Sequence, residues 1–294
     1  MSIGPAPTPT DVFERERPRL VGLAYRMLGT VTDAEDVVQD AWLRWQSVRI
    51  DQLERPEAWL TTVTTRVALD HLRSTRRRRE TYVGPWLPEP LVSPAGPEDA
   101  AVLADSLRLG FLTVLDQLTP VERAVFLLAD VFAVPFAEIA ATVDKSEVAC
   151  RQIASRARRR VRQPTSARDP DADRTITDAL MAAIAVGDIA QVLERLAPDV
   201  VCVADGGATR RAARRPVIGA TRVARLLVNL AHRYRGDIEV RTASVNGDAG
   251  AVIVVGGEVD VVAAFEIRDH RVVAIRLVRN PNKLAHVECP VPLE

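Results

Sequence analysis

The most constraining feature of this chain is the segment 135–161, in which a short helix, a tight turn and a basic helix follow one another. Pro135 can open the first helix, which runs to Ala141, and residues 142–145 then form the turn. Ser146 can cap the second helix, whose apolar side chains gather on one side and whose Arg and Gln side chains gather on the other. This pattern predicts a helix–turn–helix, whose second helix enters the major groove of DNA.

The outward face of this second helix carries side chains that can read DNA bases. Arg and Gln form paired hydrogen bonds with base edges, and residues 146–163 hold six arginines against Glu147 alone. The whole chain has no net charge, but binding to phosphates depends on local basic patches. A basic amphipathic helix that faces only solvent is the alternative. The residues expected to contact DNA are Ser146, Arg151, Gln152, Ser155, Arg156, Arg158 and Arg159.

A first helical domain is predicted over residues 8–79. Between Ala34 and Trp45 the apolar residues recur at helical spacing, and Thr32 and Glu35 have the spacing of a capping box. Another face of this helix is acidic, which indicates either a binding surface or a solvated one. The acidic stripe consists of Asp33, Asp36 and Asp40.

A further helix of this domain is predicted to begin near Pro56 and to bury a stripe from Trp59 to Leu72. Threonine and arginine side chains lie off that stripe, and Arg73 and four consecutive arginines, 76–79, follow. Such a surface suits a phosphate backbone, with a solvated helix end as the alternative. The off-stripe residues are Thr61, Thr62, Thr65 and Arg66.

Proline-rich segments separate the remaining domains. Residues 80–97 hold five of the nineteen prolines and predict a linker, residues 98–163 return to helical spacing, and residues 163–173 predict a second linker. Residues 172–279 predict an α+β domain in which helices cover one face of a curved antiparallel sheet. Its hairpin turns are expected at Asn246–Gly247 and Asp269–His270.

Catalysis has weak support in this α+β domain. Asp205, Asp260, Glu266, His232 and His270 are the acid or base candidates, but they show no Ser/His/Asp order and no metal-ligand spacing. We therefore expect no catalytic residue, no cofactor and no metal.

The composition points to the cytoplasm. The three cysteines (Cys150, Cys202 and Cys289) are far apart, and no stretch of eighteen apolar residues and no secretory signal is evident. We therefore expect a cytoplasmic protein with no membrane contact.

Three stretches in order resemble the extracytoplasmic-function (ECF) sigma factors of bacterial RNA polymerase. DAEDVVQDAWLRW (33–45) resembles the family's polymerase-docking helix, WLTTVTTRVALDHLR (59–73) its promoter −10 helix, and residues 135–161 its −35 helix–turn–helix. The resemblance implies a core-polymerase interface at Asp33, Glu35, Asp36, Gln39 and Asp40. It implies −10 contacts from Thr61, Thr62, Thr65, Arg66, Arg73, Arg76 and Arg77, and −35 contacts from the seven residues named above. Many members carry Asn at the place of Arg66, which leaves the −10 sequence preference open.

A narrower resemblance is to the subgroup with a fused SnoaL-like domain, a cone with a pocket. RRETYVGPWLPEP (78–90) is similar to its linker, Asp205–Gly206–Gly207 to the start of its Asp-Gly-Gly-Gly-Lys motif, and NPNKL (280–284), within the tail 280–294, to its Asn-Pro-Asp-Lys-Leu. Ala208, Thr209 and Asn282 depart from these motifs. The resemblance implies regulatory contacts among Trp86, Leu87, Pro88, Glu89, Pro90, Asp205, Gly206, Gly207, Asn280, Pro281, Lys283 and Leu284, with Trp86 as an apolar anchor.

Together these observations predict a sigma factor that binds core polymerase and promoter DNA and is modulated by its own C-terminal domain. A small-molecule ligand in the C-terminal pocket is left open. Two alternatives remain: a transcription factor that binds DNA without polymerase, and a SnoaL-like enzyme fused to a DNA-binding module.

Overall fold

The computed structural model describes residues 8–80, 82–94, 107–161, 169–233 and 238–287. The chain divides into two compact units, Met1–Glu80 with Val114–Arg162, and Thr81–Thr113 with Gln163–Glu294. The predicted linker of residues 80–97 therefore falls, almost whole, within the same unit as the C-terminal domain. The fold class is as predicted, with helical N-terminal parts and an α+β C-terminal domain.

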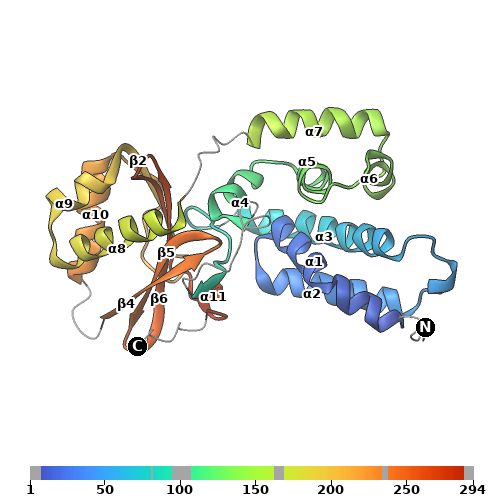
Figure 1. Cartoon of the computed structure of the whole chain (residues 1–294), viewed down its shortest axis with the longest axis horizontal. Helices are drawn as coiled ribbons and strands as arrows, with labels where there is room; N and C mark the ends of the chain where they lie inside the picture. Colours follow the sequence, from blue (N-terminus) through green and yellow to red (C-terminus); the bar gives the residue numbers. More distant parts are fainter. Residues whose placement is uncertain (1–7, 81, 95–106, 162–168, 234–237, 288–294) are drawn as a thin grey trace, which may run out of the picture. The chain divides into compact units, whose positions relative to one another are not determined.

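The first helical domain packs α1 (Pro9–Leu28), α2 (Val31–Gln46) and α3 (Pro56–Glu80) against one another, with a 3₁₀ turn, η1 (Ile50–Gln52), before α3 (Figure 1). The predicted capping box at Thr32 is wrong, because α2 begins at Val31 after Thr30, whose side chain makes no capping hydrogen bond. The predicted apolar face is buried at Ala34, Val37, Val38, Ala41 and Trp45.

The second helical domain contains α4 (Leu109–Leu115), α5 (Pro120–Phe126), a π turn η3 (Leu127–Val131), α6 (Phe136–Val143) and α7 (Glu147–Val161). The helix–turn–helix is confirmed, and α6 runs two residues beyond its predicted end. Asp144 turns the chain with a left-handed backbone, and the Ser146 hydroxyl accepts a hydrogen bond from the Ala149 amide at 3.2 Å.

A buried arginine ties the two helical domains together. The Arg123 side chain is almost fully shielded from water, and its guanidinium donates to the carbonyls of Leu115 (3.0 Å) and Met27 (2.6 Å) and to the Asp116 carboxylate. Leu115 and Asp116 lie just before α5, whereas Met27 lies near the end of α1. A buried guanidinium that satisfies three acceptors fixes the geometry between these elements.

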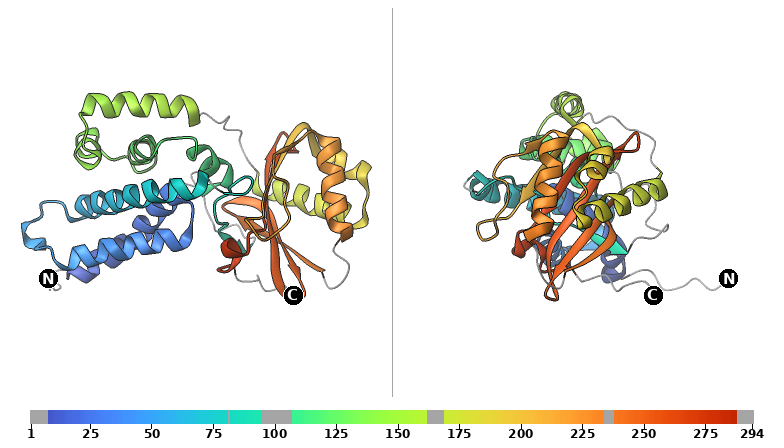
Figure 2. Two further views of the ribbon diagram at one scale, coloured as in Figure 1. Left: turned by 180° about the vertical axis from the view of Figure 1, so that it is seen from behind. Right: turned by 90° about the vertical axis from the view of Figure 1, so that its left-hand side faces the viewer.

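In the second unit, α8 (Pro170–Val186), α9 (Ile189–Arg195) and α10 (Ala220–Arg233) cover one face of a bent sheet (Figure 2). The strand order is β1-β4-β5-β6-β7-β2-β3. The strands are β1 (Val92–Pro94), β2 (Leu196–Asp205), β3 (Val217–Ile218), β4 (Ile238–Val245), β5 (Asp248–Val255), β6 (Glu258–Arg268) and β7 (Arg271–Val278).

The sequence prediction needs three corrections here. The sheet is mixed rather than antiparallel, because β2 pairs in parallel with β7. The predicted first linker contributes the edge strand β1, which pairs with β4 from Val92 to Pro94. The second linker is shorter than predicted, because the Asp169 side chain caps α8, which begins at Pro170.

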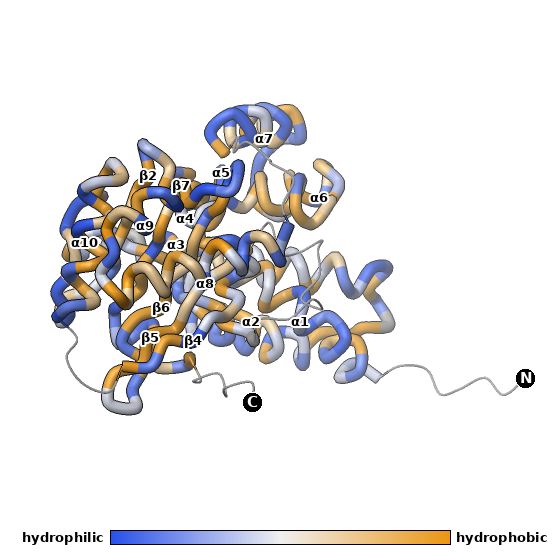
Figure 3. Tube along the Cα trace, turned by 60° about the vertical axis from the view of Figure 1, so that its left-hand side comes forward, coloured by the Kyte–Doolittle hydropathy of each residue, from blue (hydrophilic) through white to orange (hydrophobic). Residues whose placement is uncertain are grey.

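Two apolar clusters lie on opposite faces of this sheet, and the hydrophobic stretches along β5 and β6 are visible in Figure 3. One cluster, which includes Leu180, Leu227 and Phe265, packs under the helices. The other includes Leu87 from the linker and Leu284 from the tail, both buried against strands of the sheet. The linker and the tail therefore share one core with the C-terminal domain.

The hairpin turns fall where the sequence placed them. Asn246 and Gly247 both have positive φ, as do Asp269 and His270. In β6 the register shifts so that Ile253 pairs with Val261 and Val254 pairs with Val259, which leaves Asp260 as an extra residue. This bulge places the Asp260 carboxylate in the ion pairs described below.

Candidate nucleic-acid interface and linker cluster

The outward face of α7 is open to solvent. All seven residues expected to contact DNA are exposed, whereas Cys150, Ile153, Ala157 and Val161 are buried on the other side of the helix. The helix therefore presents the polar and cationic surface that the spacing predicted.

The arginines on this face form only weak ion pairs with neighbouring side chains. Arg151 pairs with Glu147 at 3.0 Å and lies 5.1 Å above the Phe136 ring, and Arg158 pairs with Asp130 at 2.8 Å. Ion pairs between exposed side chains are worth little, at most about 1 kcal/mol. These arginines can therefore exchange their protein partners for bases or phosphates.

The acidic face of α2 is also accessible. Glu35, Asp36, Gln39 and Asp40 are exposed, whereas Asp33 is half-buried and its carboxylate lies 3.2 Å from Nε2 of His71 in α3. The predicted stripe is thus mostly available to a basic partner.

The threonines of α3 differ from the surface that the sequence indicated. Thr65 is fully buried and its hydroxyl donates to the Thr61 carbonyl at 2.7 Å, while the nearly buried Thr61 hydroxyl donates to the Glu57 carbonyl at 2.8 Å. Arg73 is exposed and pairs with Asp70 at 3.1 Å. The helix runs through Arg76 and Arg77, whose side chains lie outside the described part of the structure.

The remaining α3 residues contact α6. The Arg66 guanidinium donates to the backbone carbonyls of Ala141 (2.7 Å) and Thr142 (3.2 Å), and the Thr62 and Thr142 hydroxyl oxygens lie 3.2 Å apart. Just before α3 begins, Arg55 forms an ion pair with Glu138 of α6. The first helix of the helix–turn–helix thus covers the threonine and arginine face of α3.

A second cluster centres on the carboxylate of Asp205. This residue lies at the end of β2 and is completely buried. One oxygen accepts hydrogen bonds from the Tyr82 hydroxyl (2.5 Å) and the Gly207 amide (3.0 Å). The other accepts from the Leu87 amide (2.9 Å) and from Nζ of Lys283 (2.7 Å). This carboxylate therefore joins the linker, its own loop and the C-terminal tail.

Lys283, in α11 (Pro281–Leu284), completes the cluster. Its ammonium group also donates to the Leu87 carbonyl and lies 4.0 Å from the centre of the Trp86 ring. The side-chain amide of Asn280 donates to the Tyr82 hydroxyl at 2.7 Å. Burial, together with the adjacent Asp205 carboxylate, raises the pKa of the Tyr82 hydroxyl far above its ordinary value. The tyrosine therefore stays a hydrogen-bond donor.

The two glycines after Asp205 allow this close packing. A Cβ at Gly206 would clash with the Arg210 carbonyl oxygen, and a Cβ at Gly207, where φ is +60°, would lie 2.8 Å from Cγ of Asn280. We refer below to Tyr82, Trp86, Leu87, Asp205, Gly207, Asn280 and Lys283 as the linker cluster.

The structure brings together the linker and tail residues for which the sequence implied regulatory contacts, with one change of emphasis. Leu87, not Trp86, is the fully buried apolar side chain, whereas the Trp86 ring is half-buried beneath the Lys283 ammonium. Pro88, Glu89, Pro90, Gly206 and Leu284 are buried, and Pro281 is exposed.

Sequence reasoning missed three residues that hold the linker. They are Tyr82, Asn246, which exchanges hydrogen bonds with Leu91, and His286, whose Nε2 lies 3.0 Å from the Pro90 carbonyl oxygen. Tyr82 lies within the stretch that resembles the subgroup's linker, which is the one signal that could have indicated it.

A cavity of about 450 Å³ lies between α8, α10 and strands β4 to β7. Of the five acid or base candidates, His232 lines it. Asp205 is held in the linker cluster, Asp260 pairs with Arg279 at 2.8 Å, and Glu266 pairs with Arg276 at 3.0 Å. Burial opposes ionisation of Glu266, but Arg276 and Arg268 outweigh it and lower the pKa of this carboxyl.

Within the part of the chain that the structure describes, no cluster of three or more His, Cys, Asp or Glu side chains is arranged to hold a metal ion. None of the described helices combines the length and apolar character needed to cross a membrane.

Known protein families match both helical regions, and known relatives match most of the chain. Residues 12–78 match the family described as Sigma-70 region 2, and residues 108–161 match Sigma-70, region 4. The chain is 43% identical over 286 residues to the ECF RNA polymerase sigma factor SigJ of Mycobacterium tuberculosis, which covers 92% of this chain and 91% of that protein. It is 37% identical over 193 residues to a probable ECF RNA polymerase sigma factor SigI of the same species, covering 64% of this chain and 67% of that protein. The crystal structure of SigJ superposes with a TM-score of 0.74 at 38% identity, covering 94% of this chain and 98% of that chain.

Proposed function

Because this chain belongs to the ECF sigma factors, which bind core RNA polymerase and direct it to promoters, we propose that its C-terminal domain regulates that activity by holding the linker between its two promoter-binding domains. The observation that carries the proposal is the buried Asp205 carboxylate, which binds Tyr82 and Leu87 of the linker and Lys283 of the tail.

Each surface of the helical domains has its own binding partner. The exposed face of α7 binds the −35 duplex, with Arg151 and Gln152 at base edges and the other arginines at phosphates. The acidic face of α2 binds a basic surface of core polymerase. The face of α3 that carries Thr62 and Arg66 receives the −10 strand, and it must first lose its contacts with α6.

The linker limits how far these two domains can separate. Residues 82–94 are fixed to the C-terminal domain by the linker cluster and by β1. An extended chain spans about 3.3 Å per residue, so the released stretch has a reach of up to roughly 40 Å, whereas the fixed stretch holds its two ends at one separation. Release of the linker would restore that reach and let the two promoter-binding domains take other separations.

We also propose that the C-terminal domain is a regulator and not an enzyme. An acid or base that acts on a bound molecule must face the cavity. Asp205, Asp260 and Glu266 are not among its lining residues, and each is engaged in an ion pair. Turnover of a small molecule by the purified chain, lost on substitution of His232, would favour the enzyme alternative instead. Because polymerase and promoters meet in the bacterial cytoplasm, we place the protein there.

The proposal is tested by run-off transcription with purified core polymerase. A chain that ends at Arg279 lacks Asn280 and Lys283, whereas a control chain that ends at Val287 keeps both. We expect the shorter chain to bind core in a pull-down but to change promoter-specific output at least three-fold, and the control to behave as the full chain does. Unchanged output from the shorter chain would refute the regulatory role of the tail. Failure of the folded full chain to bind core would favour a transcription factor that acts without polymerase.

A further inference from the structure

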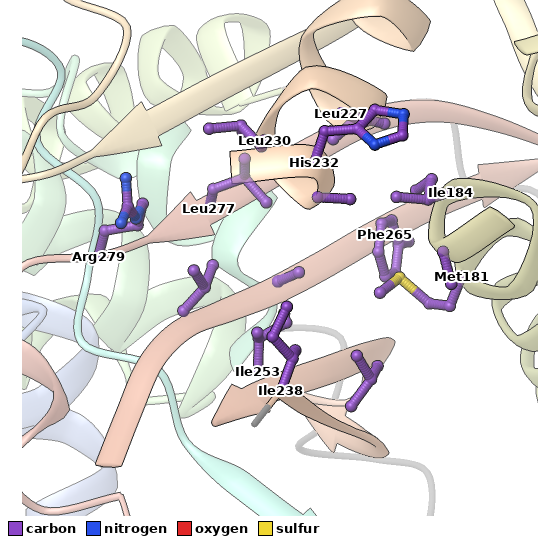
Figure 4. Close-up of a pocket in the computed structure, with 15 residues that line it drawn as sticks. Met181, Ile184, Leu227, Leu230, His232, Ile238, Ile253, Phe265, Leu277 and Arg279 are labelled. Atoms are coloured by element: carbon purple, nitrogen blue, oxygen red, sulfur yellow. The ribbon is translucent and has the colours of Figure 1, made fainter. Parts of the chain in front are cut away.

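The cavity in the C-terminal domain has the size and lining of a binding site for an apolar molecule. Its volume of about 450 Å³ falls within the range of small-molecule sites in proteins. Of the fifteen described residues that line it, all but two are apolar, among them Met181, Leu230 and Phe265 (Figure 4). A cavity with so few polar groups holds water poorly, because each water needs two or more hydrogen-bonding partners.

The two polar lining residues, His232 and Arg279, set the kind of head group that fits. Among the described residues that line the cavity there is no carboxylate, whereas Arg279 brings a cation to it. The Arg279 side chain is 12% exposed and pairs with Asp260, which Arg210 also contacts at 3.4 Å. Arg279 therefore brings a guanidinium group to a largely apolar cavity, and carboxylates are natural partners of arginine.

The lining also indicates how a ligand would lie. Ile238 and Val240, at the start of β4, are 37% and 43% exposed although they line the cavity, and the lining residue His232 at the end of α10 is also exposed. These residues mark the opening. Arg279 lies at one end of the lining and Met181 and Ile184 at the other (Figure 4).

We propose that this cavity binds an apolar monocarboxylic acid, with the carboxylate against Arg279 and the hydrocarbon part between α8, α10 and the sheet. The proposal extends to regulation, and that part rests on the function proposed above. The sites that would communicate are the cavity and the linker cluster.

Arg279 provides a short physical route between these two sites. Its backbone amide donates to the Asp205 carbonyl at 2.7 Å, and its guanidinium donates to the Arg211 carbonyl at 2.7 Å, in the loop that follows Asp205. The next residue is Asn280, which binds the Tyr82 hydroxyl. A carboxylate that repositions Arg279 would therefore disturb both the loop after Asp205 and the tail at Asn280. Linkage makes the effect reciprocal: the factor by which ligand binding shifts the release of the linker cluster equals the factor by which that release shifts ligand affinity.

Binding is tested by calorimetry on the full chain with octanoate, decanoate and dodecanoate, each compared with its alcohol. We expect saturable binding of at least one acid, at least tenfold tighter than its alcohol. Ile253→Trp, which fills the cavity from β5, should weaken acid binding at least tenfold, whereas Val259→Trp adds the same ring to the other apolar cluster and should not. Circular dichroism verifies folding, and Ala185→Phe, in α8, replaces Ile253→Trp if that variant misfolds. No acid binding, equal affinity for the alcohols, or unaffected binding by the folded cavity variants would overturn the proposal.

Regulation is tested by adding the tightest-binding acid to run-off transcription. We expect at least a threefold change in output with the full chain and none with Ile253→Trp. If the acid binds but leaves transcription unchanged, coupling to the linker cluster is refuted. If truncation at Arg279 changes transcription while no acid binds, the proposed function stands and this inference fails.

Discussion

The ammonium nitrogen of Lys283 lies 2.7 Å from Oδ2 of Asp205, and the two side chains are only 6% and 0% exposed. The residues are 78 positions apart, one ending a strand of the sheet and the other near the C-terminus. A buried ion pair stabilises a fold little more than two apolar side chains of similar volume would. Removal of one partner, however, leaves the other charge buried without a counter-charge, which is strongly destabilising. Loss of either partner would therefore weaken the cluster that holds the linker.

Asp205→Asn should lower the free energy of unfolding of the second unit by about 3–5 kcal/mol, because Lys283 would keep its buried charge without an anion. Urea denaturation of the full chain measures this loss. The double variant Asp205→Asn/Lys283→Met should lose at least about 1 kcal/mol less than the sum of the single variants, since it removes both charges. Strictly additive losses would contradict the pairing.

Stability should also fall at high pH through Tyr82. Its folded pKa is raised above the ordinary value of about 10, first by burial and then by Asp205, so the folded state holds the proton more tightly than the unfolded state. This contribution is complete below about pH 10 and is lost as pH rises towards the folded pKa. Between pH 9 and 11 the parent chain should therefore lose more stability than Tyr82→Phe, measured by urea titration at each pH. Parallel pH profiles would show that Tyr82 ionises freely.

Gly207→Ala should destabilise the linker cluster, and Gly256→Ala supplies a matched control. Both glycines have φ of +60°, so an alanine at either costs about 1–2 kcal/mol in backbone strain. A Cβ at Gly207 also meets Asn280 at 2.8 Å, whereas a Cβ at Gly256 meets nothing within 4 Å. Gly207→Ala should therefore lose more stability and increase tail cleavage in limited proteolysis. Equal loss of stability in the two variants would mean that Asn280 and the tail can move away from the added Cβ without a loss of free energy.

Local patterns were enough to predict the helix–turn–helix and the hairpins. Apolar spacing, the proline at 135 and the Ser146 cap determine α6 and α7 from nearby residues, and the Asn246–Gly247 pair determines a tight turn. The strand β1 was missed because three residues, Val92 to Pro94, form a strand only through pairing with β4, which lies about 150 residues later. The parallel pairing of β2 with β7 was missed for the same reason.

The burial of Thr61 and Thr65 in α3 also could not be predicted from the spacing of apolar residues. Thr61 and Thr65 satisfy their hydroxyls on carbonyls one turn earlier, so they pack in a core as small apolar residues do. The resemblance brought Asp205, Asn280 and Lys283 into one list, but hydrogen-bond partners such as Tyr82 follow only from the folded chain.

The contact between α3 and α6 predicts that a cross-link will block initiation. The Thr62 and Thr142 hydroxyl oxygens are 3.2 Å apart, so cysteines at these positions are close enough for a disulfide. In a Cys289→Ser background, oxidised Thr62→Cys/Thr142→Cys should lose at least tenfold in promoter-specific transcription, and reductant should restore it. The single cysteine variants are the controls. Full activity of the oxidised chain would show that α6 stays on α3 during initiation.

Arg151→Ala should weaken binding of −35 duplex by about 1–3 kcal/mol if this exposed guanidinium contacts a base edge, as we propose. Arg160→Ala is the control, since Arg160 holds both oxygens of Glu122 and lies outside the set expected to contact DNA. Fluorescence anisotropy with cognate and scrambled duplexes separates base reading from phosphate contact. Arg151→Ala should reduce the preference for cognate DNA, whereas Arg160→Ala should leave it unchanged. An equal loss on both duplexes would make Arg151 a phosphate contact, and its salt dependence would then fall by about one counterion.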